Sequence, residues 1–236
     1  MRVLALDTTT RRGSVAVVED DRVIAEHEGD VTRTHAERLP RDLIEVLEAA
    51  RVPLASIDVF AVASGPGSFT GLRIGIAAIQ GLALVTGRRV VAVSLLEALG
   101  HVAACGRRPG ALVAGWVDAH RRDVFAALYR VIGHDGQITD AIEEVESPRV
   151  DRPELVLRDW FERAPGPVAI AGDGAVLFQD VIGRLSEVIA PPPMAAVIGR
   201  LAPLEAANGG SMSPAGVQPL YVRRPDAEIA RDQKLS

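Results

Sequence analysis

Cysteine is almost absent from this sequence, which holds Cys105 as its single cysteine. No disulfide within the chain and no cysteine-rich metal site can therefore form. Lysine is equally rare, because Lys234 in the C-terminal tail is the only lysine among the 26 basic residues. Chemistry that depends on a lysine is therefore excluded from the rest of the chain.

Long apolar segments are also missing. The sequence has no uninterrupted apolar run of about 18 residues, so no membrane span is expected. Its first residues lack the apolar segment of a signal peptide, and we expect a cytoplasmic protein. A net charge of −5 makes the chain a poor nucleic-acid binder by itself. With 236 residues, 48% of them hydrophobic, the chain is typical of one large globular domain or two small ones.

The first half of the sequence predicts hairpin strands that lead into parallel crossover units. Strands are expected at 2–8, 13–19, 22–28, 57–64 and 89–93, and helices at 35–51, 71–86 and 94–105. Thr34 and Glu37 form a capping box at the start of the first helix. Pro40 is expected to bend or delay that helix.

The second half repeats this pattern of strands followed by crossovers. Strands are expected at 111–118, 123–131, 137–146 and 167–172, and helices at 153–163, 174–187 and 194–207. We therefore predict an N-terminal lobe at 1–105 and a C-terminal lobe at 106–236, with the option that the helix near 194–207 packs back on the first lobe.

The glycine-rich stretch "GPGSFTG" does not match a nucleotide-binding loop. Leu72 and Arg73 stand where a Walker A motif needs a lysine and a hydroxyl residue, and the third glycine of a dinucleotide fingerprint is replaced by Thr70. The stretch instead predicts a tight strand-to-helix turn. Its structural residues are Gly65, Pro66, Gly67, Thr70 and Gly71, with unusual φ angles at Gly65 and Gly67 and a helix cap at Thr70.

A second candidate site is the predicted hairpin "DTTTRRGS". Its Asp7, Thr8, Thr9 and Ser14 are typical of hairpins that bind phosphate through hydroxyls and backbone N–H groups. Short turns of this composition are also common without any ligand, so these residues are a possible remnant of a phosphate loop.

The histidines do not form a pair at helical spacing. They are His27, His35, His101, His120 and His134. No local metal clamp is therefore expected from them. The charged stretch 118–123 predicts a solvated hairpin turn, and no Ser/His/Asp arrangement stands out. We predict no catalytic residue, no metal site and no cofactor.

The helix expected at 71–86 is apolar on every side except at Arg73 and Gln80. If the sheet covers Ile74, Ala78, Leu82 and Val85, then the opposite face needs another cover. Either the helix at 35–51, approaching over small residues such as Gly71 and Gly75, or a partner subunit can supply it. The candidate interface residues are His35, Leu39, Leu43, Arg73, Ile76, Ile79, Gln80 and Ala83.

Taken together, "LALDTTT", "THAERL", "SGPGSFTGLRIG" and "DAHRRDVFAALY" resemble the TsaB (YeaZ) family. The resemblance implies an α/β fold with two lobes, of the actin/hexokinase/Hsp70 type, in which each lobe is a mixed sheet with helices. It implies a non-catalytic subunit in threonylcarbamoyladenosine synthesis that pairs with the catalytic TsaD and the ATPase TsaE. Such a subunit meets tRNA only through the complex, needs no membrane, and forms a homodimer when alone.

The resemblance also bears on metal binding. The catalytic relative binds its metal through two histidines in a segment like "VNHLEGH", and the matching segment here is "VSLLEAL", with Leu95 and Leu99 at the two positions. On that comparison the chain cannot build the catalytic metal site. The alternative is an independent ATPase or small-molecule kinase that uses "DTTT" for phosphate. A glycoprotease would need a metal or a nucleophile that the sequence does not reveal.

Overall fold

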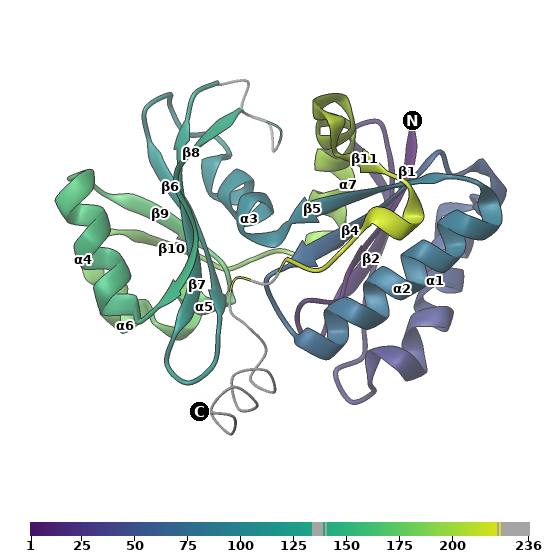
Figure 1. Ribbon diagram of the computed structural model, residues 1–236, viewed down its shortest axis with the longest axis horizontal. Coiled ribbons are helices and arrows are strands. Elements are labelled where there is room, and N and C mark those ends of the chain that lie inside the picture. The colour runs from purple at the N-terminus through teal and green to yellow at the C-terminus, as the bar shows by residue number, and fades with distance from the viewer. Residues whose placement is uncertain (134–138, 140, 221, 223–236) are drawn as a thin grey trace, which may run out of the picture.

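The chain folds into two lobes, each built on one β-sheet (Figure 1). The computed structural model describes residues 1–133, 139, 141–220 and 222. Across these residues, helices and sheets alternate in layers, with helices outside each sheet and between the two (Figure 1). The predicted two-lobed α/β architecture, with a mixed sheet and helices in each lobe, is confirmed.

The first sheet has the strand order β11-β5-β4-β1-β2-β3. Its strands are β1 (Arg2–Asp7), β2 (Ser14–Glu19), β3 (Arg22–Glu28), β4 (Val59–Gly65), β5 (Arg89–Ser94) and β11 (Ser211–Met212). The first three form an antiparallel meander because short turns join them, whereas β4 and β5 run parallel to β1. Side chains alternate across the sheet, so Leu4 and Leu6 face one layer and Val3 and Ala5 the other.

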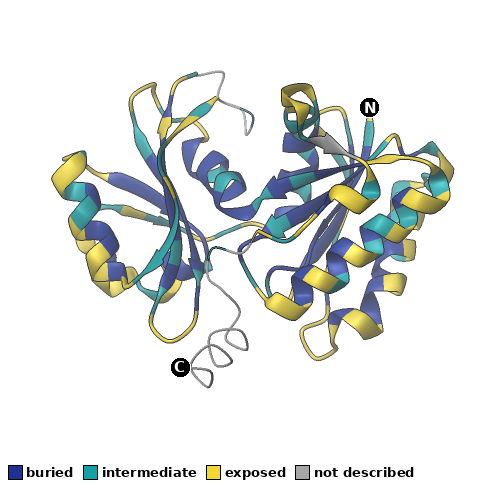
Figure 2. Ribbon diagram, viewed as in Figure 1, coloured by how far each residue is buried: buried dark blue, intermediate teal, exposed yellow. Residues whose placement is uncertain are grey.

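Helices α1 (His35–Ala50) and α2 (Phe69–Thr86) cover the Leu4 and Leu6 face of this sheet. The capping box predicted at the start of α1 is present, with the Glu37 carboxylate accepting the Thr34 backbone N–H at 2.7 Å. Pro40 lies inside α1, which runs through it from His35 without an interruption. Figure 2 shows buried residues concentrated in the strands and on the helix sides that face them.

The second sheet has the strand order β10-β9-β6-β7-β8. Its strands are β6 (Leu112–Asp118), β7 (Val124–Val131), β8 (Ile142–Asp151), β9 (Val168–Ala171) and β10 (Glu187–Ile189). Helices α4 (Pro153–Arg163), α5 (Asp173–Leu177) and α6 (Gln179–Ile182) cover its outer face. In this core the rings of Trp116 and Trp160 meet at a tilt, with their centroids 6.0 Å apart.

The two remaining helices, α3 (Leu95–Ala104) and α7 (Met194–Glu205), lie between the sheets (Figure 1). Although α3 precedes the predicted boundary at residues 105 and 106, it packs chiefly on β6, β7 and β9 of the second sheet. Conversely, α7 comes from the end of the chain and packs on β1, β2 and β5 of the first sheet. Each lobe therefore contributes a helix to the other lobe's sheet, and one shared core joins them.

The structure corrects several element predictions. The helix expected at 174–187 is divided into α5 and α6, and α6 ends at Ile182 because Gly183 has a left-handed φ of +66°. The short strand β10 begins at Glu187, the last residue of that expected helix, and β11 lies in a stretch that was expected to be a loop. The strand expected at 137–146 begins in part outside the described residues, as does His134, and β8 continues to Asp151.

Candidate functional site

The glycine-rich turn connects β4 to α2, but its cap differs from the prediction. Helix α2 begins at Phe69, and the Ser68 hydroxyl caps it by accepting the Gly71 N–H at 3.2 Å. Thr70, predicted as the cap, lies exposed in the first turn. Gly65 has the expected left-handed φ of +112°, whereas Gly67 does not. A glycine is needed at 67 for space, because a Cβ there would lie 2.6 Å from the Thr9 Cβ.

The two motifs singled out in the sequence lie against each other. Gly67, Gly71 and Gly75 are spaced by four residues and face the turn after β1. A Cβ on Gly71 would lie 2.1 Å from the Thr8 carbonyl oxygen, and one on Gly75 would lie 2.2 Å from the Thr8 Oγ1. The Ser68 N–H also donates to the Thr9 carbonyl at 2.7 Å. The glycines therefore let α2 approach the hairpin turn, and residues of that turn, rather than α1, lie beside them.

The polar residues of the β1–β2 hairpin are used inside the protein. The Asp7 Oδ1 accepts both the backbone N–H and the hydroxyl of Thr9, at 2.9 and 2.6 Å. The Thr8 side chain is buried against Gly75. The Ser14 hydroxyl accepts the Ala195 N–H at 2.9 Å and so supports the first turn of α7. The predicted remnant of a phosphate loop therefore has clear structural roles at Asp7, Thr8, Thr9 and Ser14.

A cleft of about 540 Å³ lies between the lobes beside this hairpin. Its lining residues include Asp7 from the first lobe and Asp173 from the second. Burial raises the pKa of Asp7 despite the two hydrogen bonds from Thr9, and the negative charge of Asp173 raises it further. Burial is also the main cause of the raised pKa of Asp173. Two carboxyl groups thus face a partly apolar cleft.

Leu95 and Leu99 line the same cleft. Each is 2% exposed and belongs to the core that joins the two lobes. The resemblance implies that the catalytic relative has its two metal-binding histidines at these positions. The alkyl side chains of leucine offer no electron pair to a cation. The residues present therefore do not fit the catalytic metal of that relative.

The charged stretch 118–123 forms the turn of the β6–β7 hairpin, as predicted. Its His120, Arg121 and Arg122 are exposed and have φ angles of +58°, +56° and +69°. Asp118 steadies the turn by accepting the His120 N–H at 2.8 Å. His120 and Asp118 also line a cavity of about 510 Å³ that reaches Thr9 and Ser68 in the first lobe.

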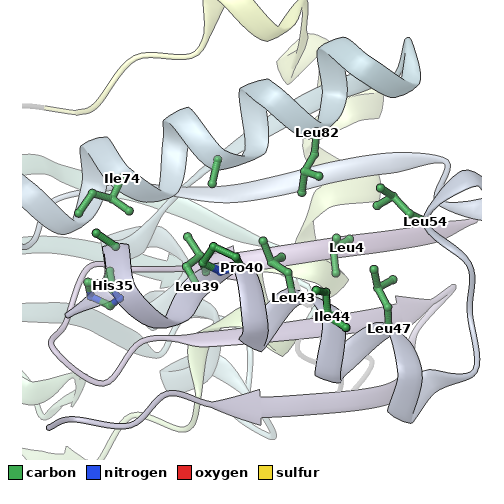
Figure 3. A pocket seen from close by; sticks show the side chains of 12 residues that line it. Leu4, His35, Leu39, Pro40, Leu43, Ile44, Leu47, Leu54, Ile74 and Leu82 are labelled. Carbon is green, nitrogen blue, oxygen red and sulfur yellow. The ribbon is translucent and has the colours of Figure 1, made fainter. Parts of the chain in front are cut away.

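A second candidate site is an apolar groove of about 410 Å³ between α1 and α2 (Figure 3). We call it the α1–α2 groove, and its lining residues are Leu4, His35, Ala36, Leu39, Pro40, Leu43, Ile44, Leu47, Leu54, Ile74, Ala78 and Leu82. Ala36, Pro40 and Ile44 are exposed at its rim, and the Ile44 residue is 56% exposed. Residues 36, 40, 44 and 47 form an apolar stripe on α1. Pro40 and Ile44 were not among the predicted interface residues, although their helical spacing could have shown them.

The structure reverses the predicted orientation of α2. Ile76, Ile79 and Ala83 face the first sheet and are at most 4% exposed. Ile74, Ala78 and Leu82, which the sheet was expected to cover, instead line the groove. The reason lies in Gly71 and Gly75, which must face the Thr8 turn and so set the rotation of the helix.

The other predicted interface residues divide between the groove and the interior. Leu39 and Leu43 are buried at its floor, and His35 lies at one end (Figure 3). Gln80 is engaged within the chain, because its amide donates to the carbonyls of Pro214 and Val217 at 2.8 and 3.1 Å. Arg73 is exposed and stacks on the Phe69 ring at 3.8 Å from the centroid.

Among the described residues, α2 is the one helix with the length and hydropathy of a membrane span. A core helix of a globular protein meets the same two criteria. Here α2 buries Leu72, Ile76 and Ile79 against the first sheet, while Leu84 and Val85 beyond the groove are 75% and 87% exposed. Its apolar character therefore has a structural use on one side and leaves exposed hydrophobic residues on the other.

A cluster of acidic residues lies where α3, α7 and β8 meet. Burial, together with the charges of Glu205 and Glu144, raises the pKa of Glu97 on α3 to about 7. Burial also raises the pKa of Glu205, at the end of α7.

We predict that Glu97→Gln makes the free energy of unfolding less dependent on pH. Since the pKa is raised in the folded state, the contribution of Glu97 to stability is full below about pH 4.5 and is lost as the pH rises through about 7. At about pH 8 the variant is expected to be more stable than the wild type by about 1 to 2 kcal/mol, because water still screens the partly exposed carboxyl. Urea unfolding at about pH 4.5 and about pH 8 measures the difference in stability between the variant and the wild type. Glu154→Gln on the exposed side of α4 is the control. Equal pH profiles for Glu97→Gln and the wild type would contradict it.

Comparisons with known proteins give consistent matches. The family model described as "TsaD: tRNA N6-adenosine threonylcarbamoyltransferase" matches residues 23–170. An uncharacterized protein of Mycobacterium tuberculosis is 34% identical over 231 residues, which cover 96% of this chain and 93% of that protein. The tRNA threonylcarbamoyladenosine biosynthesis protein TsaB of Escherichia coli is 34% identical over 190 residues, covering 80% of this chain and 78% of that protein. The solved structure of YeaZ from Pseudomonas aeruginosa superposes with a TM-score of 0.77 at 31% identity, covering 93% of this chain and 99% of that one.

Proposed function

Because the chain belongs to the TsaB (YeaZ) family, we propose that it is a non-catalytic partner subunit of the complex that attaches threonylcarbamoyl to tRNA adenosine next to the anticodon. The observation that carries this proposal is the α1–α2 groove. Its rim exposes Ala36, Pro40 and Ile44, and its walls are almost wholly apolar. Exposed apolar surfaces of this kind mark sites of protein association.

The cleft between the lobes supports a non-catalytic role. Leu95 and Leu99 occupy the positions of the relative's metal ligands and are buried in the shared core. The hydroxyls of Thr9 and Ser14 are hydrogen-bonded to Asp7 and to the first turn of α7. The groups with which a related enzyme would bind a metal or phosphate are therefore replaced or engaged here.

The partner that we propose for the groove is the catalytic subunit TsaD, bound as a heterodimer. The ATPase TsaE joins this pair in the working complex, and tRNA is bound only through the complex. In the absence of TsaD, we propose that two copies of this chain associate through the same apolar groove. The proposed reaction places the chain in the cytoplasm, where its tRNA substrate is found.

Reconstitution of the modification reaction tests the proposed function. TsaD, TsaE, the synthase of threonylcarbamoyl-adenylate and unmodified tRNA are combined with and without this chain. Modified adenosine is expected only when the chain is present, and the chain alone is expected to modify nothing. Equal modification in its absence would contradict the proposal.

A second candidate function is an independent ATP-binding enzyme. The observation in its favour is the interlobe cleft, in which Asp7 and Asp173 face a space of about 540 Å³ beside the hairpin. Calorimetry of the isolated chain with ATP and Mg²⁺ separates the two candidates. Tight binding that Asp7→Ala weakens would favour the enzyme, whereas the partner-subunit proposal expects no tight binding.

A further inference from the structure

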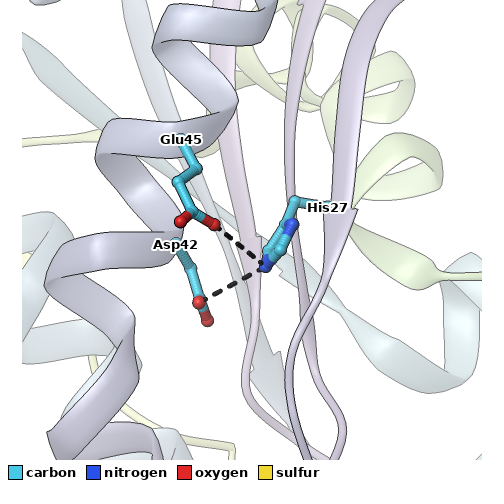
Figure 4. Close-up of side chains that lie close together, drawn as sticks. All are labelled: His27, Asp42 and Glu45. Atoms are coloured by element: carbon cyan, nitrogen blue, oxygen red, sulfur yellow. Dashed lines mark ion pairs between the residues drawn. The ribbon is translucent and has the colours of Figure 1, made fainter.

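His27 on β3 faces two carboxylates on α1 (Figure 4). Asp42 and Glu45 are three residues apart and therefore share one face of the helix. One ligand atom from each of the three residues lies within 4.8 Å of the others. An imidazole and two carboxylates from separate elements thus converge at the edge of the first sheet.

The distances within this cluster are unlike those of hydrogen bonds. The His27 Nε2 lies 3.4 Å from the Asp42 Oδ1 and 3.8 Å from the Glu45 Oε2. Hydrogen bonds from nitrogen to oxygen span about 2.7 to 3.2 Å. Two ligands bound to one zinc ion at about 2.0 to 2.2 Å and at a tetrahedral angle lie about 3.3 to 3.5 Å apart. The Asp42 distance already matches that separation, and the Glu45 distance exceeds it by a few tenths of an ångström.

The second oxygen of each carboxylate has its own cationic partner. Arg38, which is 2% exposed, donates to the Asp42 Oδ2, and Arg41 donates to the Glu45 Oε1 at 2.6 Å. The oxygens that remain are those that face His27. Hydrogen-bonded outer groups of this kind orient the carboxylates that ligate metals. The two arginines also offset the negative charge of the pair.

We propose that His27, Asp42 and Glu45 bind one zinc-class divalent cation, with water as the remaining ligand. One imidazole and two carboxylates suit zinc, or cobalt and nickel as substitutes, better than magnesium or calcium, which favour oxygen ligands alone. The cation joins strand β3 to helix α1, which forms one wall of the α1–α2 groove. This inference does not depend on the proposed function.

The alternative for the same geometry is an ion pair between His27 and the two carboxylates. The two readings differ in their response to zinc. A metal site binds one cation per chain, and the bound cation stabilises the folded chain. An ion pair is indifferent to zinc.

Titration calorimetry with zinc on the full-length, untagged chain tests the site. Every protein carries Cys105→Ser, because an exposed thiol can bind zinc by itself. We expect one zinc per chain, and an affinity lowered by more than about 10-fold in His27→Gln and in Glu45→Gln, given what even outer groups contribute at metal sites. Glu48→Gln, which replaces an exposed carboxyl on the same helix, is the matched control and is expected to bind as the parent does.

Two further measurements make the result decisive. At a zinc concentration about 100-fold above the dissociation constant, the melting temperature of the parent is expected to rise by about 5 to 10 °C, and that of His27→Gln is not. Cobalt in place of zinc is expected to give the visible absorption of a four-coordinate ion, which chelator removes. Absence of zinc binding in the parent, or equal binding in His27→Gln and the parent, would overturn the proposal in favour of the ion pair.

Discussion

Ile44→Glu is expected to weaken binding of TsaD, the proposed partner, at least about 100-fold while leaving the fold of the chain intact. Ile44 lies on the rim of the α1–α2 groove and is 56% exposed in the chain by itself (Figure 3). A partner seated on the groove removes it from water, and an unpaired buried carboxylate costs several kcal/mol. A loss of 100-fold corresponds to about 2.7 kcal/mol. Glutamate is a better helix former than isoleucine, so α1 itself is not weakened.

Binding assays and the reconstituted reaction measure this effect, and Ile132→Glu provides the matched control. Ile132 is 55% exposed and follows β7 in the second lobe, far from the groove in the fold. Unchanged binding by Ile44→Glu would show that the groove is not the interface. Loss of binding by both variants would mean that the added negative charge, and not its place in the groove, causes the loss. A charge at Ile79 cannot serve as this test, because Ile79 is fully buried against the sheet and its replacement would disrupt the lobe.

Gly71→Ala is expected to lower the free energy of unfolding by at least about 2 kcal/mol. The added Cβ would lie 2.1 Å from the Thr8 carbonyl oxygen, which belongs to the backbone and cannot rotate away as a side chain can. Relief of this overlap requires α2 to move from the β1–β2 turn. Such a movement strains the 2.7 Å hydrogen bond from the Ser68 N–H to the Thr9 carbonyl.

Gly81→Ala is the control in the same helix, and it is expected to have the opposite sign. Gly81 is exposed within α2, and apart from its chain neighbours and the backbone of the helix itself no described atom lies within 4 Å of a Cβ built on it. Alanine there should raise the free energy of unfolding by about 0.5 to 1 kcal/mol, because it restricts the unfolded chain and favours the helix. Urea unfolding of the three proteins measures both effects. Equal effects of the two substitutions would mean that the contact with Thr8 does not decide the role of Gly71.

The order of the helices and strands could be predicted from local sequence patterns. The strands β1, β2 and β3, the helices α1 and α4 and the capping box at Thr34 agree with the predictions to within a residue or two. Their periodicity and their turn residues are local properties, so the sequence displays them directly. The short strand β11 was missed because it is a strand only by pairing with β5.

The rotation of α2 about its own axis could not be predicted from local sequence patterns. A helix that is apolar on all sides has two equivalent candidate faces, and its hydrophobic pattern cannot choose between them. The choice depends on Thr8, more than 60 residues earlier in the chain, whose turn admits only the side with Gly71 and Gly75. The predicted interface therefore included Ile76 and Ile79, which are core residues, and omitted Ile44.

By itself, the sequence determined the two-lobed α/β class, the absence of a lysine from the glycine-rich turn, and the presence of Leu95 and Leu99 where the resemblance implies the relative's two histidines. Those conclusions depend on which residues are present and on their local spacing. Only the tertiary structure decided that the two motifs pack together, which side of α2 is exposed, and that His27 meets Asp42 and Glu45. Each of these depends on contacts between segments that are distant along the chain, and a sequence carries no local signal for them.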